Sequence, residues 1–339
     1  MDVEQVLLLV VAVAVVLAVF FDALVTTLKV GDTGPLTRFV LGRAWHLVLR
    51  LHRRDSGSAL LRSTGPALLF GTVLVWVVLL WAGWSLVFWE VGAVVDAQTS
   101  APAPLVETVY YAGFTVFTLG VGDYVSATST GRLLTAVAGF SGLFLITLAI
   151  TYLLSVVSAV VDRRALAARV HTLGDDAQSI VVNGWNGQGF ASAFVQHLVS
   201  LTGQVTDVAE QHLAYPVLHY FRSRERSSAA PCALVHLDEA MLLLDSGIAP
   251  EARPHPDAVE PVRRAIGHYI DTASRTTTAR GVPDVPAAPG RALLERAGLP
   301  LADERDHQRA VSATAERRRR LRQLLESNGW SWPTAPGDR

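Results

Sequence analysis

The residue types that could do chemistry are concentrated in one short run, Thr118-Leu119-Gly120-Val121-Gly122-Asp123, which lies between two long apolar stretches. A dehydrated cation needs a ring of oxygen ligands. Backbone carbonyls provide such a ring where successive residues alternate in the hand of their φ/ψ values, which glycine adopts without steric cost. The Thr118 hydroxyl can add one oxygen layer. The simpler alternative is a glycine-rich turn between two membrane helices, and the flanking segments decide between the two.

The composition places the chain among membrane proteins with a sizeable soluble part. Half of its 339 residues are hydrophobic and only 17% are charged, which is too apolar for an ordinary soluble domain. Cys232 is the only cysteine, so no internal disulfide or thiolate metal site is possible. No catalytic constellation, phosphate-binding loop or pair of histidine ligands is found, so we expect neither an enzyme nor a bound cofactor.

Residues 1–28 are predicted to form an N-terminal transmembrane helix, because the apolar run is long enough to cross the hydrocarbon layer. Acidic residues before the run argue against a signal peptide. Asp22 lies inside this span, where an ionisable group is costly and faces protein or water. It could pair with an arginine at the cytoplasmic mouth, or it could be an acid near the interface that bonds to Thr26 or to water.

Residues 29–65 are predicted to form a basic cytoplasmic or interfacial linker. Basic residues recur there at helical spacing opposite an apolar side, as in a helix that lies in the headgroup layer. A packed soluble helix is the alternative.

The next segment, residues 66–162, has the order span, short external turret, half-length helix, glycine-rich loop and span. The predicted elements are an outer helix at 66–91, a turret at 92–104, a pore helix at 104–117, the loop at 118–123 and an inner helix at 133–161. The half-length helix is too short to span. Three tryptophans near the end of the outer helix suggest an interfacial aromatic belt: Trp81, Trp84 and Trp89.

Basic residues set the expected orientation. The 29–65 linker and the segment after Val161 are rich in arginine, whereas 92–131 carries acids and no basic residue. The positive-inside rule then places both basic segments in the cytoplasm. We expect a multi-pass plasma membrane protein with its N-terminus outside and its C-terminal domain in the cytoplasm.

This pore segment resembles the pore module of bacterial two-transmembrane potassium channels, here with an extra N-terminal helix. The run T-L-G-V-G-D is similar to the T-V-G-Y-G-D signature of that family, and Gly131-Arg132 and Gly142 fall at family landmarks of the inner helix. The resemblance implies passive K⁺ conduction through a backbone-carbonyl selectivity filter. One chain supplies one filter strand and a closed ring needs four, so we expect a homotetramer in membrane lipid.

The resemblance also implies roles for individual residues. K⁺ would be bound by the backbone carbonyls of Thr118, Leu119, Gly120 and Val121, and also by the Thr118 hydroxyl. The filter would be supported by Gly122, Asp123, Tyr110 and Tyr111. Gly142 would be the gating hinge, with Gly139 favouring close packing. The inner pore would be lined by Ile146, Ile150, Leu154 and Ser158, which could equally face lipid.

Two residues depart from the family pattern. Val121 stands where relatives carry an aromatic residue whose hydroxyl braces the filter, and Phe114 stands where some relatives carry an acid that pairs with the filter aspartate. Tyr110 and Tyr111 could compensate by filling volume and bonding to Asp123. We expect a less rigid filter.

Residues 163–339 are predicted to form a helical cytoplasmic domain, with helices at about 190–222, 233–246, 258–274, 290–297 and 303–327. Arg317 to Arg320 are interpreted as a solvated helix face, so no nucleic-acid partner is expected. The predicted fold is an all-α membrane protein. A weakly selective cation channel and a membrane-anchored scaffold or signalling protein with a vestigial pore remain as alternative functions.

Overall fold

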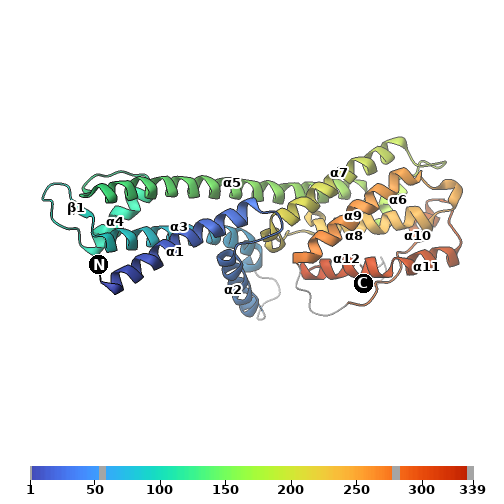
Figure 1. Cartoon of the computed structure of the whole chain (residues 1–339). Helices are drawn as coiled ribbons and strands as arrows, with labels where there is room; N and C mark the ends of the chain where they lie inside the picture. The colour runs from blue at the N-terminus through green and yellow to red at the C-terminus, as the bar shows by residue number, and fades with distance from the viewer. Residues whose placement is uncertain (1, 53–58, 277–282, 334–339) are drawn as a thin grey trace. The chain divides into compact units, whose positions relative to one another are not determined.

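A computed structural model describes residues 2–52, 59–276 and 283–333 (Figure 1). Within these ranges, the side chains of residues 44–62 and 275–276 lie outside the description. The chain divides into two compact units, Met1–Val156 and Val157–Arg339. This division falls slightly before residue 163, where the sequence places the start of the soluble domain.

The first unit is almost entirely helical, and the predicted all-α membrane fold is confirmed. Among the described residues, three helices are long and apolar enough to cross a membrane. The elements that begin in this unit are α1 (Val3–Leu28), α2 (Pro35–His52), α3 (Ala59–Val91), β1 (Val94–Asp96), α4 (Leu105–Val116), β2 (Tyr124–Ser126) and α5 (Ser129–Leu173).

Two of these helices extend further than the sequence predicts. Helix α3 begins at Ala59 and continues through Pro66. A membrane helix tolerates the loss of the one backbone hydrogen bond that proline removes. Helix α5 runs without a break for 45 residues, about 65 Å at 1.5 Å per residue. Its hydropathy falls after residue 161, but alanine, leucine and arginine continue there and are strong helix formers.

Asp22 joins the first three helices, and its partners among the described residues are neither an arginine nor Thr26. Its carboxylate is fully buried and accepts hydrogen bonds from the Leu36 and Thr37 amides, the Thr37 hydroxyl and the Trp76 indole at 2.5–3.2 Å. The amide donors belong to the first turn of α2, so Asp22 satisfies groups that a helix N-terminus leaves without partners. Thr26 instead accepts a hydrogen bond from the Gly34 amide.

Two of the three tryptophans predicted as an aromatic belt are internal braces. Trp81 donates its indole N–H to the Val109 carbonyl of α4 at 2.9 Å. Trp84 is buried and donates to the Ser141 hydroxyl of α5 at 2.9 Å. Only Trp89 among them is exposed. The outer helix therefore holds the pore helix and the inner helix through directed hydrogen bonds.

A small antiparallel sheet follows α3 and closes one end of the unit. Strand β1 pairs with β2 so that Val94 faces Ser126 and Asp96 faces Tyr124. The Ala97 amide also donates to the Asp123 carbonyl at 2.9 Å. Because β2 begins directly after the glycine-rich run, the turret fixes where that run leaves the pore region.

The second unit is a helical domain with one large apolar core. Its helices are α6 (Ala177–Gly184), α7 (Ser192–Ala214), η1 (Pro216–Tyr220), η2 (Arg226–Ser228), α8 (Ala230–Leu242), η3 (Leu243–Gly247), η4 (Pro250–Ala252), α9 (Pro256–Thr276), α10 (Ala292–Arg296), α11 (Glu304–Ala313) and α12 (Ala315–Ser327). Helix α8 is central, since every one of its residues except His236 is buried. The last turns of α5 contribute Leu166, Ala167 and Val170 to the same core.

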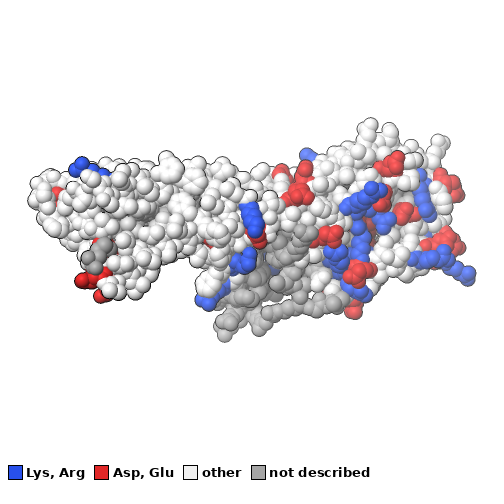
Figure 2. Space-filling model, in the orientation of Figure 1, with Lys and Arg blue, Asp and Glu red and all other residues white. Residues whose placement is uncertain are grey.

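The arginine run on α12 is not the solvated face that the sequence suggests. Arg318 is fully buried and makes a two-pronged ion pair with Glu239 of α8 at 2.6 and 2.8 Å. Arg317 pairs with Asp238 beside it. These two arginines hold α12 against the central helix. Figure 2 shows the contrast in surface chemistry, with charged side chains concentrated over the helices of the second unit.

Candidate ion-conducting site

The half-length helix α4 ends at the glycine-rich run and aims its last turn at it. Pro104 precedes the helix and Glu107 lies in its first turn, as helix N-termini prefer. The second half of α4, from Tyr111 to Val116, is buried. The helix therefore enters the protein without crossing the membrane, and its C-terminal carbonyls carry partial negative charge toward the run.

The backbone of the run alternates in hand. Thr118, Gly120 and Gly122 have φ values of +58°, +59° and +87°, whereas Leu119 and Val121 between them do not have positive φ. Positive φ is rare outside glycine, and Thr118 is one of the few non-glycine residues that adopt it here. This alternation is the backbone geometry that a line of carbonyl ligands requires.

Hydrogen bonds fix the start of the run to the pore helix. The Leu119 and Gly120 amides both point back to the Phe114 carbonyl, at 2.7 and 3.4 Å. The Thr118 amide bonds to the Thr115 carbonyl at 3.1 Å. These three amides are directed at α4, so the start of the run is anchored to that helix.

The two apolar side chains of the run are uncovered in the single chain. Leu119 is 70% exposed and Val121 is 54% exposed. Val121 carries no group that could donate a hydrogen bond to α4, and the buried Phe114 carries no acid. The ring hydroxyl that relatives carry at position 121 and the acid that some carry at position 114 are therefore both missing from this filter region.

The two tyrosines of α4 have different partners. Tyr110 lies near Asp123, and its role in filter support stays a prediction. Tyr111 instead shares a 2.5 Å hydrogen bond with Thr135 of α5 and packs edge-on against Phe88 of α3. The expectation that Tyr111 bonds to Asp123 is wrong, and Tyr111 ties α4 to the two spanning helices.

Two acidic residues, Asp123 and Asp96, lie at or after the C-terminal end of the run and in the turret that pairs with it. Asp123 is exposed and can raise the local concentration of cations. Asp96 is already engaged by the Thr99 and Gln98 amides and the Thr99 hydroxyl at 2.7–3.0 Å. These donors lower the pKa of the Asp96 carboxyl, so it stays charged at neutral pH while it shapes the turret.

Gly142 is the point of closest approach between α5 and the pore helix. A Cβ atom there would lie 1.9 Å from the Val116 carbonyl oxygen, whereas one at Gly139 would meet only the Thr115 carbonyl at 3.6 Å. Close packing is therefore sufficient to explain the glycine at position 142. It explains the glycine at position 139 less well, because a Cβ atom would fit there. Helix α5 is unbroken at this point, and the hinge role of Gly142 stays a prediction.

The residues predicted to line the inner pore lie away from the packed face of α5. Ile150, Leu154 and Ser158 are exposed in the single chain, and Ile146 is partly buried. The opposite face packs inside the unit through Leu145, Ala149, Tyr152 and Val156, all of which are buried.

Comparison with known proteins identifies the fold that this geometry belongs to. Residues 69–159 match the family model described as "Ion channel", which covers α3 from residue 69, the pore helix, the run and most of α5. The chain belongs to the ion channel family. It is a membrane protein, and the family indicates a channel rather than an enzyme.

The resemblance to a relative extends well beyond the channel module. The uncharacterized membrane protein YdjJ of Bacillus subtilis (strain 168) is 32% identical over 316 residues, which cover 92% of this chain and 91% of YdjJ. Because the match covers 92% of this chain, it extends well beyond the channel module at residues 69–159 and includes most of the soluble domain. No solved structure matches the chain.

Several residues that position the glycine-rich run could not be identified from the sequence. Trp81, Trp84 and Thr135 have the composition of ordinary membrane helices, and only their contacts give them a role. One usable signal is present: Thr135 follows Gly131 by four residues, which places both on one face of α5.

Proposed function

We propose that the protein is one subunit of a homotetrameric channel that conducts K⁺ passively across the plasma membrane. The observation that carries this proposal is the alternating backbone of residues 118–122, with positive φ at Thr118, Gly120 and Gly122. Carbonyls of Thr118, Leu119, Gly120 and Val121 would form successive ion sites, with the Thr118 hydroxyl innermost.

The exposed apolar side chains of the run support an oligomer. Leu119 and Val121 lie uncovered next to an otherwise well-packed pore helix, and neighbouring copies around a four-fold axis would cover them. A heterologous ring of identical subunits closes the filter without any further component. The N-terminus would be outside and the domain after residue 163 in the cytoplasm, as the basic residues favour.

Potassium flux into liposomes that contain the purified protein tests this proposal. Gly120→Ala should abolish the flux, because an L-residue is strained at φ +59°. Gly71→Ala is the matched control, since Gly71 lies in α3 with open space around its Cβ position and without positive φ. Flux that survives Gly120→Ala, or that is absent from the wild type, would contradict the proposal and favour a scaffold with a vestigial pore.

A weakly selective cation channel is the second candidate, and Val121 is the observation that favours it. Without a ring hydroxyl at 121 or an acid at 114, fewer groups hold the carbonyls at the spacing that K⁺ needs. Selectivity then depends on Tyr110 near Asp123 and on the anchoring of the run at Phe114.

A further inference from the structure

A basic and partly apolar patch lies just beyond the end of the first span. Helix α1 ends at Leu28, and the α2 patch consists of four exposed side chains that follow it: Lys29, Arg38, Phe39 and Arg43. Figure 2 shows basic side chains in the region of α2, beside the nearly uncharged surface of the spans. The stretch 29–43 contains these three basic residues and a single acid, Asp32, so its net charge is positive.

Helix α2 has one face against the spans and one face that is uncovered. On the inward face Thr37 and Leu41 are buried, and the Thr37 hydroxyl donates to the Asp22 carboxylate of α1 at 2.5 Å. Phe39 and Arg43 lie on the opposite face, because an α-helix turns by about 100° per residue. Phe39 is 55% exposed, and Figure 1 shows α2 turned away from the direction of α1. The outward face of α2 therefore has no cover among the described residues.

Phe39 and Arg43 form an amphipathic pair on this outward face. The guanidinium carbon of Arg43 lies 4.0 Å from the centroid of the Phe39 ring. A guanidinium stacked on a ring keeps its N–H groups at its edge, where they match the oxygens of a phosphate. An aromatic side chain beside a basic one is typical of helices that lie at a membrane surface. The pair therefore presents a phosphate-binding group next to an apolar one.

The positive charge of the α2 patch is only partly compensated within the protein. Lys29 pairs with Asp32, and the Arg38 guanidinium lies 3.9 Å from the same carboxylate. Arg38 also donates to the Thr33 carbonyl at 3.1 Å, which leaves most of its five N–H groups for another acceptor. Because two basic residues share one acid and Arg43 adds a third positive charge, the patch attracts anions.

We propose that the α2 patch docks on anionic phospholipids at the membrane surface where α1 ends. Helices α1 and α3 are long and apolar enough to cross a membrane, and only residues 29–34 separate α1 from α2. Helix α2 therefore begins within reach of the headgroup layer. The three basic side chains would bind phosphate groups, and the Phe39 ring would lie at the boundary with the acyl chains.

Other occupants fit the α2 patch less well. A soluble anion would neutralise the basic residues but leave Phe39 in water, together with the exposed Leu28 and Val30. A zwitterionic lipid surface would cover these apolar side chains but has no net charge to match the basic residues. An anionic phospholipid provides both the negative charge and the apolar layer.

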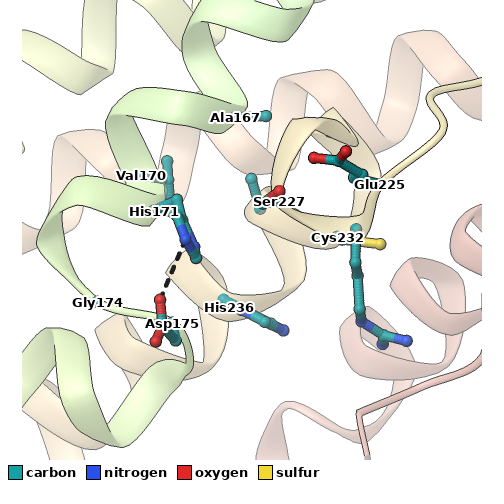
Figure 3. A pocket seen from close by; sticks show the side chains of 11 residues that line it. Ala167, Val170, His171, Gly174, Asp175, Glu225, Ser227, Cys232 and His236 are labelled. Atoms are coloured by element: carbon teal, nitrogen blue, oxygen red, sulfur yellow. Dashed lines mark ion pairs between the residues drawn. The ribbon is translucent and has the colours of Figure 1, made fainter.

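The pocket of the soluble unit is a poorer site for an anionic headgroup. Its volume is about 430 Å³, and two acids line it, Asp175 and Glu225. Asp175 is paired with His171 at 3.2 Å (Figure 3). Arg226 also lines the pocket, and its guanidinium donates to the Ser331 carbonyl at 2.6 Å. A headgroup would lie close to carboxylates there, whereas basic residues are in excess at the α2 patch.

Docking would stabilise the hydrogen bonds that join the first three helices. The first turn of α2 donates the Leu36 and Thr37 amides to Asp22, and the Trp76 indole of α3 donates to the same carboxylate at 2.8 Å. A lipid that binds α2 in this position favours the folded state, so anionic lipid should raise the thermal stability of the protein. This effect does not depend on the proposed channel function.

Lipid binding to the full-length protein in detergent tests the proposal. The probes are phosphatidylglycerol and phosphatidylcholine with identical acyl chains, and the readouts are lipid retention in native mass spectrometry and the midpoint of thermal unfolding. Phosphatidylglycerol should be retained at least about tenfold more strongly, because each basic residue near anionic lipid contributes about fivefold. It alone should raise the midpoint. Equal effects of the two lipids would overturn the proposal.

Soluble glycerol 3-phosphate separates a membrane contact from a simple anion site. At the same concentration it should leave the unfolding midpoint unchanged, because it has no acyl chains to cover the apolar side chains of the patch. If it raised the midpoint as much as phosphatidylglycerol, the patch would bind a free anion, and docking on lipid would be refuted.

Variants of the two arginines localise the contact. The double variant with Arg38→Gln and Arg43→Gln loses two charges and should retain phosphatidylglycerol about tenfold or more weakly. The double variant with Arg38→Lys and Arg43→Lys keeps both charges and should lose less. Arg305→Gln is the control, because Arg305 is exposed on α11 in the soluble unit.

Both guanidinium groups are exposed, so the neutral double variant should fold, and its unfolding midpoint without lipid should equal that of the wild type. Unchanged retention of phosphatidylglycerol in this variant would overturn the assignment. An equal loss in Arg305→Gln would also overturn it, since it would show that the lipid binds any exposed arginine.

Discussion

Position 142 shows how a missing side chain can define a contact. The Val116 carbonyl at the end of the pore helix occupies the space that a Cβ atom at 142 would need. Gly142 therefore sets how closely α5 approaches α4, and α4 in turn anchors the glycine-rich run through Phe114. The same residue could still act as a hinge, but a substitution there changes packing first.

We predict that Gly142→Ala lowers stability by about 1–3 kcal/mol, the cost typical of overpacking. The Cβ atom would have to displace backbone rather than a flexible side chain. Thermal unfolding of the purified protein measures the change. Gly139→Ala serves as the control, since its Cβ would meet the Thr115 carbonyl at an ordinary contact distance of 3.6 Å. Equal stability of the two variants would show that α5 does not pack here as described.

At the same scale, Asp22→Asn should destabilise the protein by about 2–4 kcal/mol, because an amide replaces a buried carboxylate that accepts from three residues. The control is Asp32→Asn, an exposed acid paired with Lys29, where we expect a change within about 0.5 kcal/mol. The free energies of unfolding of both variants provide the measurement. Similar values would mean that Asp22 does not bind α2 and α3 together.

The sequence predicted the chemistry of individual residues better than their partners. The glycine pattern at 118–122 correctly indicated a backbone of alternating hand, because φ preference is a property of single residues. Asp22 was correctly recognised as an acid too costly to face lipid. Its actual partner Trp76 lies 54 positions further along the chain, and such a contact is set by helix packing that one sequence does not display.

At the scale of elements, the end of α5 is held by the soluble domain. Arg163 is buried and donates to the Leu218 carbonyl of η1 at 2.7 Å, and Asp162 accepts from Gln211 of α7 at 2.7 Å. Nearby, burial together with the Arg163 and Arg222 charges lowers the pKa of His219 to about 4. In the folded protein, His219 therefore stays neutral until the pH falls to about 4.

This arrangement predicts a pH dependence of stability. His219 takes up a proton at its ordinary pKa of 6.5 when unfolded but only near pH 4 when folded. Its contribution is therefore present above pH 6.5 and is lost as pH falls toward 4, by up to about 3 kcal/mol. Burial also lowers the pKa of His212 and of His236, and both act in the same direction.

Thermal unfolding between about pH 7 and pH 4 checks this prediction. Stability should fall over that interval in the wild type and fall less in His219→Gln. His255→Gln is the control, since His255 is 76% exposed and should leave the pH profile unchanged. Identical profiles for His219→Gln and the wild type would show that His219 is not buried as a neutral group.

Helices that hydropathy marks clearly were predicted from the sequence, and helices or helix ends that it does not mark were missed. The three spans and the half-length helix were found because their lengths compare directly with the membrane thickness. The extension of α5 to Leu173 was missed, since its apolar stripe narrows to Leu166, Ala167 and Val170. The short helix α6 was also missed, because eight residues give too few turns for a periodic signal.

At the scale of the whole molecule, a channel module is joined to a helical domain with its own core. The soluble domain was predicted as helical but without its buried ion pairs, because Arg317 to Arg320 look like a solvated face in the sequence. Arg318 and Glu239 are 79 positions apart. Both are buried, and two hydrogen bonds join the guanidinium to the carboxylate. The match to YdjJ along nearly the full chain indicates that channel module and soluble domain occur together in both proteins.

The proposed function requires that residues 118–122 form a cation-selective conduction path. Recordings from the purified protein in planar bilayers, with K⁺ on one side and Na⁺ on the other, test this requirement. We predict a current that Gly120→Ala removes and Gly71→Ala leaves intact, with a reversal potential displaced toward the K⁺ equilibrium potential. A reversal potential near zero would refute potassium selectivity, and the absence of any current would contradict the channel itself.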